Sequence, residues 1–228
     1  MKAYALLGGP TDLWPEDIKK RFLKAKYAHD LVVGVDRGSL YLEELGIVPD
    51  LAVGDFDSLK PKDLSRIESN VPDIRYSNPI KDWTDSELML QTVFDDYHVT
   101  QLTILGATGG RIDHFLINLL MLLNQAIRQF AERVTILDQQ NKILFFNPGQ
   151  HSLQQDLTYP YIGFAGLTGV KNFSIKHARY ELDNFSANYP RVFSSNEFLP
   201  HQPEFEISFD EGMIAAIYSK DINRFHNL

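Results

Sequence analysis

The sequence predicts an α/β protein in which an N-terminal parallel-sheet domain precedes a C-terminal antiparallel β-sandwich or barrel. Strand-like and helix-like segments alternate over residues 1–130, which is typical of βαβ units with right-handed crossovers. Short apolar runs separated by Gly, Pro and Asn replace this alternation over residues 131–228. Of the 228 residues 44% are hydrophobic, which is enough to bury a core. We therefore expect an α/β domain at 1–130 and a β-rich domain at 131–228.

The elements of the first part follow from apolar periodicity. Compact apolar runs predict strands at residues 4–7, 31–36, 51–55, 74–76 and 102–105. A period near 3.6 residues predicts helices at residues 16–28, 85–97 and 112–130. The last helix has the most regular apolar pattern of the three. In the second part, strands are expected at residues 134–137, 142–146, 161–164, 173–177, 191–193, 204–209 and 213–218.

Composition excludes several classes of function. A net charge of −8 argues against a nucleic-acid partner, which favours a basic face. The chain has no cysteine, so disulfides and thiolate metal sites are impossible, as suits a reducing compartment. Its longest apolar stretch, residues 115–123, is far shorter than the roughly 20 residues that span a bilayer. We expect a cytoplasmic protein with no nucleic-acid or membrane partner.

Two aspartates close the expected strand at residues 51–55. In extended backbone, Asp55 and Asp57 point to the same face, where their carboxylates repel each other. A cation between them would relieve this repulsion, and oxygen ligands favour Mg²⁺ shared with a substrate phosphate. A solvated turn, where Asp is common, is the structural alternative.

The loops after the other strands carry residues of the same chemistry. The carboxyl ends of parallel strands meet at one sheet edge, where α/β proteins bind ligands. That edge is expected to gather Asp36, Asp82, Asp85, Gly109, Gly110, Arg111 and Asp113. Glycines before a helix let backbone N–H groups approach phosphate, and an arginine adds a cationic fork. Thr84 and Glu87 also match a capping box, which gives this segment a structural reading as well.

Five motifs give the chain a resemblance to the thiamine pyrophosphokinase family. They are VDRGS (35–39), GIVPDLAVGDFDSL (46–59), KDWTDSE (81–87), GATGGRIDH (106–114) and SSNEF (194–198), in the family's order. No P-loop, GxGxxG, HExxH or GxSxG motif competes with them. The resemblance implies transfer of pyrophosphate from ATP to thiamine, giving AMP and thiamine diphosphate. It also implies a homodimer whose sites lie between the catalytic domain of one subunit and the sandwich of the other.

The resemblance assigns roles by position in each motif. Asp55, Asp57 and Asp85 match the aspartates that bind Mg²⁺ and phosphate, and Asp36 and Asp113 complete that set. On the nucleotide side the matching residues are Thr84, Arg111, Arg37, Lys81, Asp82, Gly109 and Gly110. Arg37 departs from the glycine of many relatives. Ser195 and Asn196 match the loop that meets the pyrimidine of thiamine, and Phe198 and Tyr218 are candidates for stacking on it.

Two other functions remain open from the sequence. The same scaffold suits pyrophosphoryl transfer to another hydroxymethyl heterocycle, such as a pterin, although SSNEF favours thiamine. A non-catalytic sensor of Mg-nucleotide is the more distant alternative, since mere nucleotide binding needs fewer acids. The aspartate set suits two Mg²⁺ ions better than one, because attack at the β-phosphorus places charge on both products.

Overall fold

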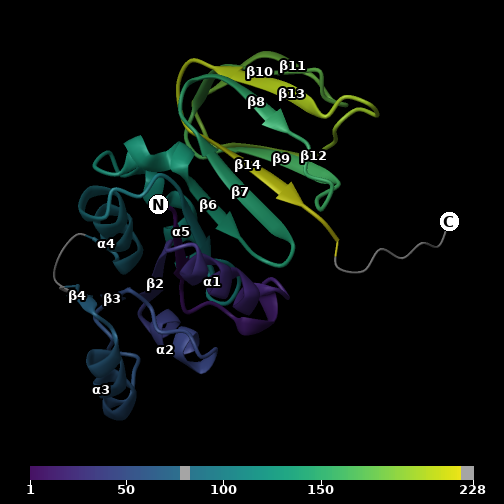
Figure 1. Cartoon of the computed structure of the whole chain (residues 1–228). Coiled ribbons are helices and arrows are strands. Elements are labelled where there is room, and N and C mark those ends of the chain that lie inside the picture. Colours follow the sequence, from purple (N-terminus) through teal and green to yellow (C-terminus); the bar gives the residue numbers. More distant parts are fainter. Residues whose placement is uncertain (78–82, 222–228) are drawn as a thin grey trace. The chain divides into compact units, whose positions relative to one another are not determined.

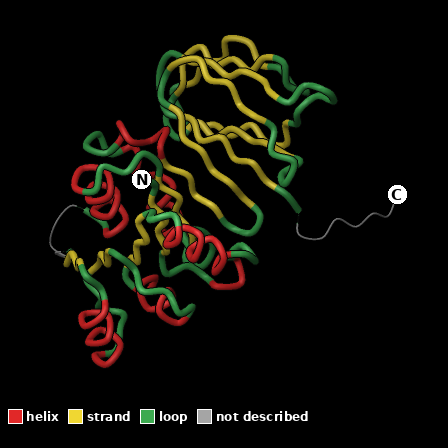
Figure 2. The backbone as a smooth tube through the Cα atoms, in the orientation of Figure 1, coloured by secondary structure: helices red, strands yellow, loops and turns green. Residues whose placement is uncertain are grey.

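The computed structural model describes residues 1–77 and 83–221, which divide into two compact units, Met1–Gln139 and Gln140–Leu228. The first unit is α/β and the second is built from antiparallel strands (Figures 1 and 2). The predicted fold class is confirmed. Within the described residues no helix is both long and apolar enough to cross a membrane.

A six-stranded parallel sheet organises the first unit. Its order is β6-β5-β1-β2-β3-β4. The strands are β1 (Ala3–Leu6), β2 (Leu31–Val35), β3 (Leu51–Gly54), β4 (Asp73–Tyr76), β5 (Leu102–Leu105) and β6 (Val134–Leu137). Every residue of β2 and β3 is buried, as expected for central strands covered on both faces. After β4 the chain returns to the other side of β1, so the topological switch point lies between β1 and β5.

Five helices accompany this sheet among the described residues. They are α1 (Ile18–Tyr27), α2 (Arg37–Glu44), α3 (Pro61–Asn70), α4 (Asp85–Gln91) and α5 (Ile112–Leu120). α1 and α2 pack on β1 and β2, and α4 packs on β2 and β3. One π-helical turn (Thr92–Asp96) extends α4, and 3₁₀ turns lie at Thr11–Leu13, Met121–Leu123 and Arg128–Arg133.

The expected helix at residues 112–130 is wrong beyond Leu120. Asn124 adopts an extended conformation, and its side-chain oxygen accepts a hydrogen bond from the Ala126 backbone N–H at 3.1 Å. Such a local side-chain bond competes with the helical ladder, so the chain turns although its apolar period continues. The short helices α2 and α3 escaped sequence reasoning, because few of their residues are buried in an apolar stripe.

The expectation that residues 134–137 open the antiparallel region is also wrong. They form β6, which pairs parallel with β5 in the register Leu102 to Val134. A short apolar run has the same pattern in a parallel and an antiparallel sheet, so the sequence could not separate them. The predicted boundary at residues 130/131 precedes β6, whereas the compact units divide after Gln139.

Two four-stranded antiparallel sheets form the second unit and face each other in Figure 1. The first has the order β12-β9-β14-β7, from β7 (Asn141–Phe146), β9 (Tyr161–Gly166), β12 (Arg191–Asn196) and β14 (Ile214–Ser219). The second has the order β11-β10-β13-β8, from β8 (Gly149–Gln154), β10 (Val170–Lys176), β11 (Leu182–Ala187) and β13 (Glu204–Phe209). Sequence reasoning missed β8 and β11 because β8 has one buried residue, β11 has none, and neither forms a clear apolar run.

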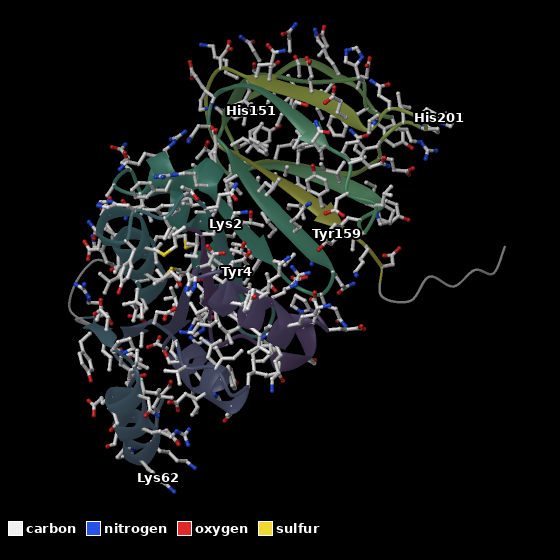
Figure 3. All side chains as sticks on the ribbon, in the orientation of Figure 1. Lys2, Tyr4, Lys62, His151, Tyr159 and His201 are labelled. Atoms are coloured by element: carbon white, nitrogen blue, oxygen red, sulfur yellow. The ribbon has the colours of Figure 1, made fainter. Side chains whose placement is uncertain are left out.

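Aromatic rings fill the space between these sheets. Phe164 lies 5.8 Å from Phe173 and 6.1 Å from Phe205, with edge-to-face geometry between ring centroids. His151 on β8 (Figure 3) has its ring centroid 4.8 Å from that of Phe146. Its Nε2 lies 2.8 Å from the carbonyl oxygen of Asn147. Because a carbonyl oxygen can only accept, the Nε2–H group is the hydrogen-bond donor. His151 is therefore part of the sandwich packing.

Candidate active site

A cavity of about 700 Å³ lies in the first unit at the carboxyl ends of its strands. The loops after β1 to β5 line it, together with the first turns of α2, α4 and α5. The predicted residues that line it are Asp36, Arg37, Asp55, Asp57, Thr84, Asp85, Gly109, Gly110 and Arg111. Asp113 lies outside this lining, and Lys81 and Asp82 lie outside the described residues.

Asp36 and Asp85 form the most unusual interaction of the cavity. Asp36 directly follows β2 and precedes α2, with φ of 47°, in a region that few non-glycine residues adopt. Its backbone N–H donates to the Val53 carbonyl at 2.8 Å, and its Oδ1 accepts from the Phe56 N–H at 3.3 Å. Burial, with a hydrogen bond to the Asp85 carboxyl and its charge, raises the pKa of Asp36 to about 8. At neutral pH the pair therefore retains a proton between its oxygens.

Gly54 makes room for this carboxyl. A Cβ at Gly54 would lie 1.9 Å from Asp36 Oδ1, and the residue has φ of 153°. Asp85 is the first residue of α4, where the positive end of the helix favours a carboxylate. The predicted capping box is confirmed: Glu87 N–H donates to Thr84 Oγ1 at 3.3 Å, and Thr84 N–H donates to Glu87 Oε2 at 2.9 Å.

The expectation of extended backbone through Asp55 and Asp57 is wrong. β3 ends at Gly54, and buried Phe56 between the two aspartates has φ of 56°. The Asp57 N–H donates to Asp55 Oδ1 at 3.0 Å, which closes an Asx turn. Both aspartates nevertheless line the cavity.

The glycine loop after β5 lies against the loop after β1. The Gly9 N–H donates to the Gly106 carbonyl at 2.9 Å, and a Cβ at Gly9 would lie 2.4 Å from that oxygen. Gly109 and Gly110 have φ of 74° and 63°, which explains why glycine is needed there. Arg111 follows at the start of α5, and its Nε donates to Asp113 Oδ1 at 3.1 Å. The guanidinium lowers the pKa of Asp113 to about 2.

The chemistry of the donor set suits a hard cation, although the protein side chains alone do not enclose one. In residues 1–77 and 83–221, no three or more His, Cys, Asp or Glu side chains are grouped so that they could hold a metal. A pair of carboxylates that keeps a proton at neutral pH is, however, a place where a divalent cation can take the proton's position. Mg²⁺ usually binds one or two carboxylates and completes its shell with water and phosphate oxygens.

Comparison with known proteins places the two units in one family. Residues 22–136 match the family model described as "Thiamin pyrophosphokinase, catalytic domain". Residues 150–214 match "Thiamin pyrophosphokinase, vitamin B1 binding domain". The chain belongs to the thiamine pyrophosphokinase family.

Individual members of the family are similar to this chain over nearly its whole length. Thiamine pyrophosphokinase of Bacillus subtilis is 32% identical over 94% of this chain and 96% of its own length. A thiamin pyrophosphokinase family protein of Enterococcus faecalis is 33% identical, with a TM-score of 0.86 over 97% of this chain and 100% of that one. Thiamin pyrophosphokinase from Geobacillus thermodenitrificans is 32% identical, with a TM-score of 0.79 over 98% and 99%.

One buried polar residue of this thiamine pyrophosphokinase family member was given no role by sequence reasoning. Buried Asn118 on α5 accepts a hydrogen bond from Ser86 Oγ at 2.9 Å and donates to the Ala107 carbonyl at 3.0 Å. It thereby joins α4, α5 and the glycine loop, and all three residues line the cavity. Its signal in the sequence is a lone amide within an otherwise apolar helical pattern.

The side chain of Asn196 is engaged within the second unit. Asn196 is 5% exposed, its Oδ1 accepts from the N–H groups of Tyr180 and Glu197, and its Nδ2 donates to the Tyr180 carbonyl at 2.8 Å. These bonds tie β12 to the preceding hairpin next to Ser195, which has φ of 60°. The predicted contact of Asn196 with thiamine stays a prediction, and only one amide hydrogen is left to make it.

Tyr218 belongs to the core of the second unit. It is 2% exposed, its hydroxyl donates to the Gln154 carbonyl at 2.9 Å, and its ring stacks on Phe198 with centroids 6.2 Å apart. Tyr159 (Figure 3) packs edge-on against it at 6.4 Å. Of the two aromatic candidates for stacking on thiamine, only Phe198 is not fully buried.

Removing the Asp36 carboxyl should change how stability depends on pH. Folding raises the pKa of Asp36 from 3.8 to about 8, so the native state binds more protons than the unfolded state between these values. This contribution to stability is therefore present at low pH and is lost as pH rises through the window. In urea titrations with a chelator present, wild type should lose stability relative to Asp36→Asn between about pH 4 and pH 8. Parallel stability curves for the two proteins would contradict this assignment.

Proposed function

We propose that this chain transfers the pyrophosphoryl group of ATP to the hydroxyl of thiamine, giving thiamine diphosphate and AMP. The observation that carries the proposal is one cavity that gathers four aspartates, a glycine turn and Arg111 in the unit that matches the family's catalytic domain. Such a site can bind a polyphosphate despite the chain's negative charge, because metal ions and Arg111 offset the repulsion.

Mg²⁺ is the proposed metal. Asp36 and Asp85 would hold it, with Asp55 and Asp57 of the same cavity nearby and the remaining ligands from phosphate and water. When bound, Mg²⁺ would neutralise charge on the transferred group and on AMP. The ion pair with Arg111 supports a different role for Asp113, which would orient the guanidinium toward the phosphates.

The chain's own residues would mainly position the reactants. Backbone N–H groups at Gly109 and Gly110, with Arg111, would hold the phosphates. The thiamine hydroxyl oxygen forms a bond to the β-phosphorus, and the bond from that phosphorus to the α,β-bridging oxygen breaks. AMP leaves with the bridging oxygen, and the hydroxyl proton passes to a carboxylate of the cavity. Ser195 and Asn196 would recognise the pyrimidine directly or through the hairpin that Asn196 holds.

The comparisons do not favour the other functions considered from the sequence. Residues 150–214 match a vitamin B1 binding domain, which supports thiamine over a pterin-like acceptor. The carboxylate set speaks against a passive nucleotide sensor. We further place the reaction in the cytoplasm, where ATP is available.

We also propose a homodimer with sites shared between subunits. One face of α5 supports it: Ile112, Leu116 and Leu120 recur every four residues, and their side chains are 74%, 44% and 39% exposed. An apolar stripe open to water is typical of a protein–protein contact.

The nature of the products tests the proposed reaction. With Mg²⁺, thiamine and ATP labelled at both the β- and γ-phosphorus, both labels should appear in one product, with an equal amount of AMP. Omitting thiamine should stop AMP release. ADP as the main nucleotide product, or AMP release that is independent of thiamine, would contradict the proposal.

The subunit composition tests the shared site. Sedimentation at micromolar concentration should give about twice the 26.1 kDa mass of the chain. Leu116→Lys should shift the protein toward the monomer and lower turnover, because a charge on the stripe opposes its burial. A fully active monomer of the wild-type chain would contradict the shared-site proposal.

A further inference from the structure

A carboxyl group is buried immediately after β6, next to the glycine loop that lines the cavity. Asp138 is only 8% exposed, and its Oδ2 accepts a hydrogen bond of 2.7 Å from the Thr108 hydroxyl. Thr108 is equally buried and belongs to the glycine loop that lines the cavity, whereas Asp138 itself does not line it. Burying a carboxylate costs free energy that an apolar residue here would avoid, so its retention calls for an explanation.

The residue after Asp138 makes a hydrogen bond to the segment that follows β1, which is the other loop of this part of the cavity. The Gln139 N–H donates to the Leu13 carbonyl at 2.9 Å. Leu13 in turn packs against the glycine loop, since a Cβ at Gly109 would lie 2.1 Å from its Cδ1. The two loops also share backbone hydrogen bonds of 2.9 Å, from Leu7 to Leu105 and from Gly9 to Gly106. The two loops are therefore joined to each other. The residues that follow β6 hold them at two places, Asp138 at Thr108 and Gln139 at Leu13.

We propose that Asp138 is a positioning residue, which acts through the Thr108 hydroxyl to fix the glycine loop where ATP phosphates bind. The loop needs such support because Gly106, Gly109 and Gly110 all have positive φ and a large loss of backbone entropy on ordering. The hydrogen bond fixes the loop between Gly106 and Gly109, next to Arg111. The identity of the ligand as ATP rests on the proposed function, whereas the hydrogen bond and the loop contacts do not.

Thr108→Val tests this role, because valine keeps the shape of threonine and removes the hydroxyl. We expect the KM for ATP to rise about tenfold and the KM for thiamine to stay within about twofold. Thr108→Ser keeps the hydroxyl and should restore the ATP KM to near the wild-type value. Thr103→Val, at a half-buried position on β5, is the matched control and should leave both constants unchanged.

The double variant Thr108→Val/Asp138→Asn separates positioning from stability. Thr108→Val alone leaves a buried charge without its hydroxyl donor, so its thermal unfolding midpoint should fall. Asp138→Asn removes that charge, so the midpoint should recover in the double variant while the ATP KM stays high. If the ATP KM recovers together with the midpoint, the pair serves stability alone and the proposal is wrong.

Nucleotide binding keeps this test independent of the proposed reaction. Calorimetry with ATP and Mg²⁺, in the absence of thiamine, should show about tenfold weaker binding to Thr108→Val than to wild type. A wild-type chain that binds ATP but releases no AMP with thiamine would overturn the proposed reaction and leave this comparison valid. Equal affinity of wild type and Thr108→Val for ATP would overturn the positioning role.

Discussion

The contact between the Asp36 and Asp85 carboxyl groups is the constraint around which the cavity is built. Two like charges share a half-buried space, so the pair is stable only with a proton or a cation between its oxygens. The unusual backbone of Asp36, the glycine at position 54 and the capped start of α4 all serve to bring these groups together. A site that repels itself when empty is suited to a ligand that brings positive charge.

Buried polar residues hold the loops around the Asp36–Asp85 pair in place through hydrogen bonds. Asn118 on α5 joins the first turn of α4 to the glycine loop, and Asp138 holds that loop from the carboxyl end of the neighbouring strand β6. In the second unit, an aromatic core holds the two sheets and Asn196 fixes a hairpin through backbone hydrogen bonds. Buried polar groups in both units thus bond to loops, which would otherwise be free to move.

The sequence predicts those parts of the molecule that depend on local patterns. Alternating periodicity revealed the sheet, and the rule for carboxyl ends brought Asp36, Asp55 and Asp85 to one cavity. Features that depend on tertiary contacts were not predictable. The parallel pairing of β6 and the partners of Asn196 both involve bonds that no residue spacing encodes. Asp138 carries no motif, and only its burial beside Thr108 draws attention to it.

Proton release on binding of Mg·ATP tests the central role of the carboxylate pair most directly. Since the pKa of Asp36 is about 8, most of the empty protein is protonated there at pH 7, and a cation in that position must displace the proton. The number of protons released on binding is measured by calorimetry in buffers of different ionisation enthalpy, after subtraction of the protons that Mg·ATP itself binds or releases. Wild type should release about one proton per site, and Asp36→Asn should release none. A binding enthalpy that shows the same dependence on buffer in both proteins would contradict the account.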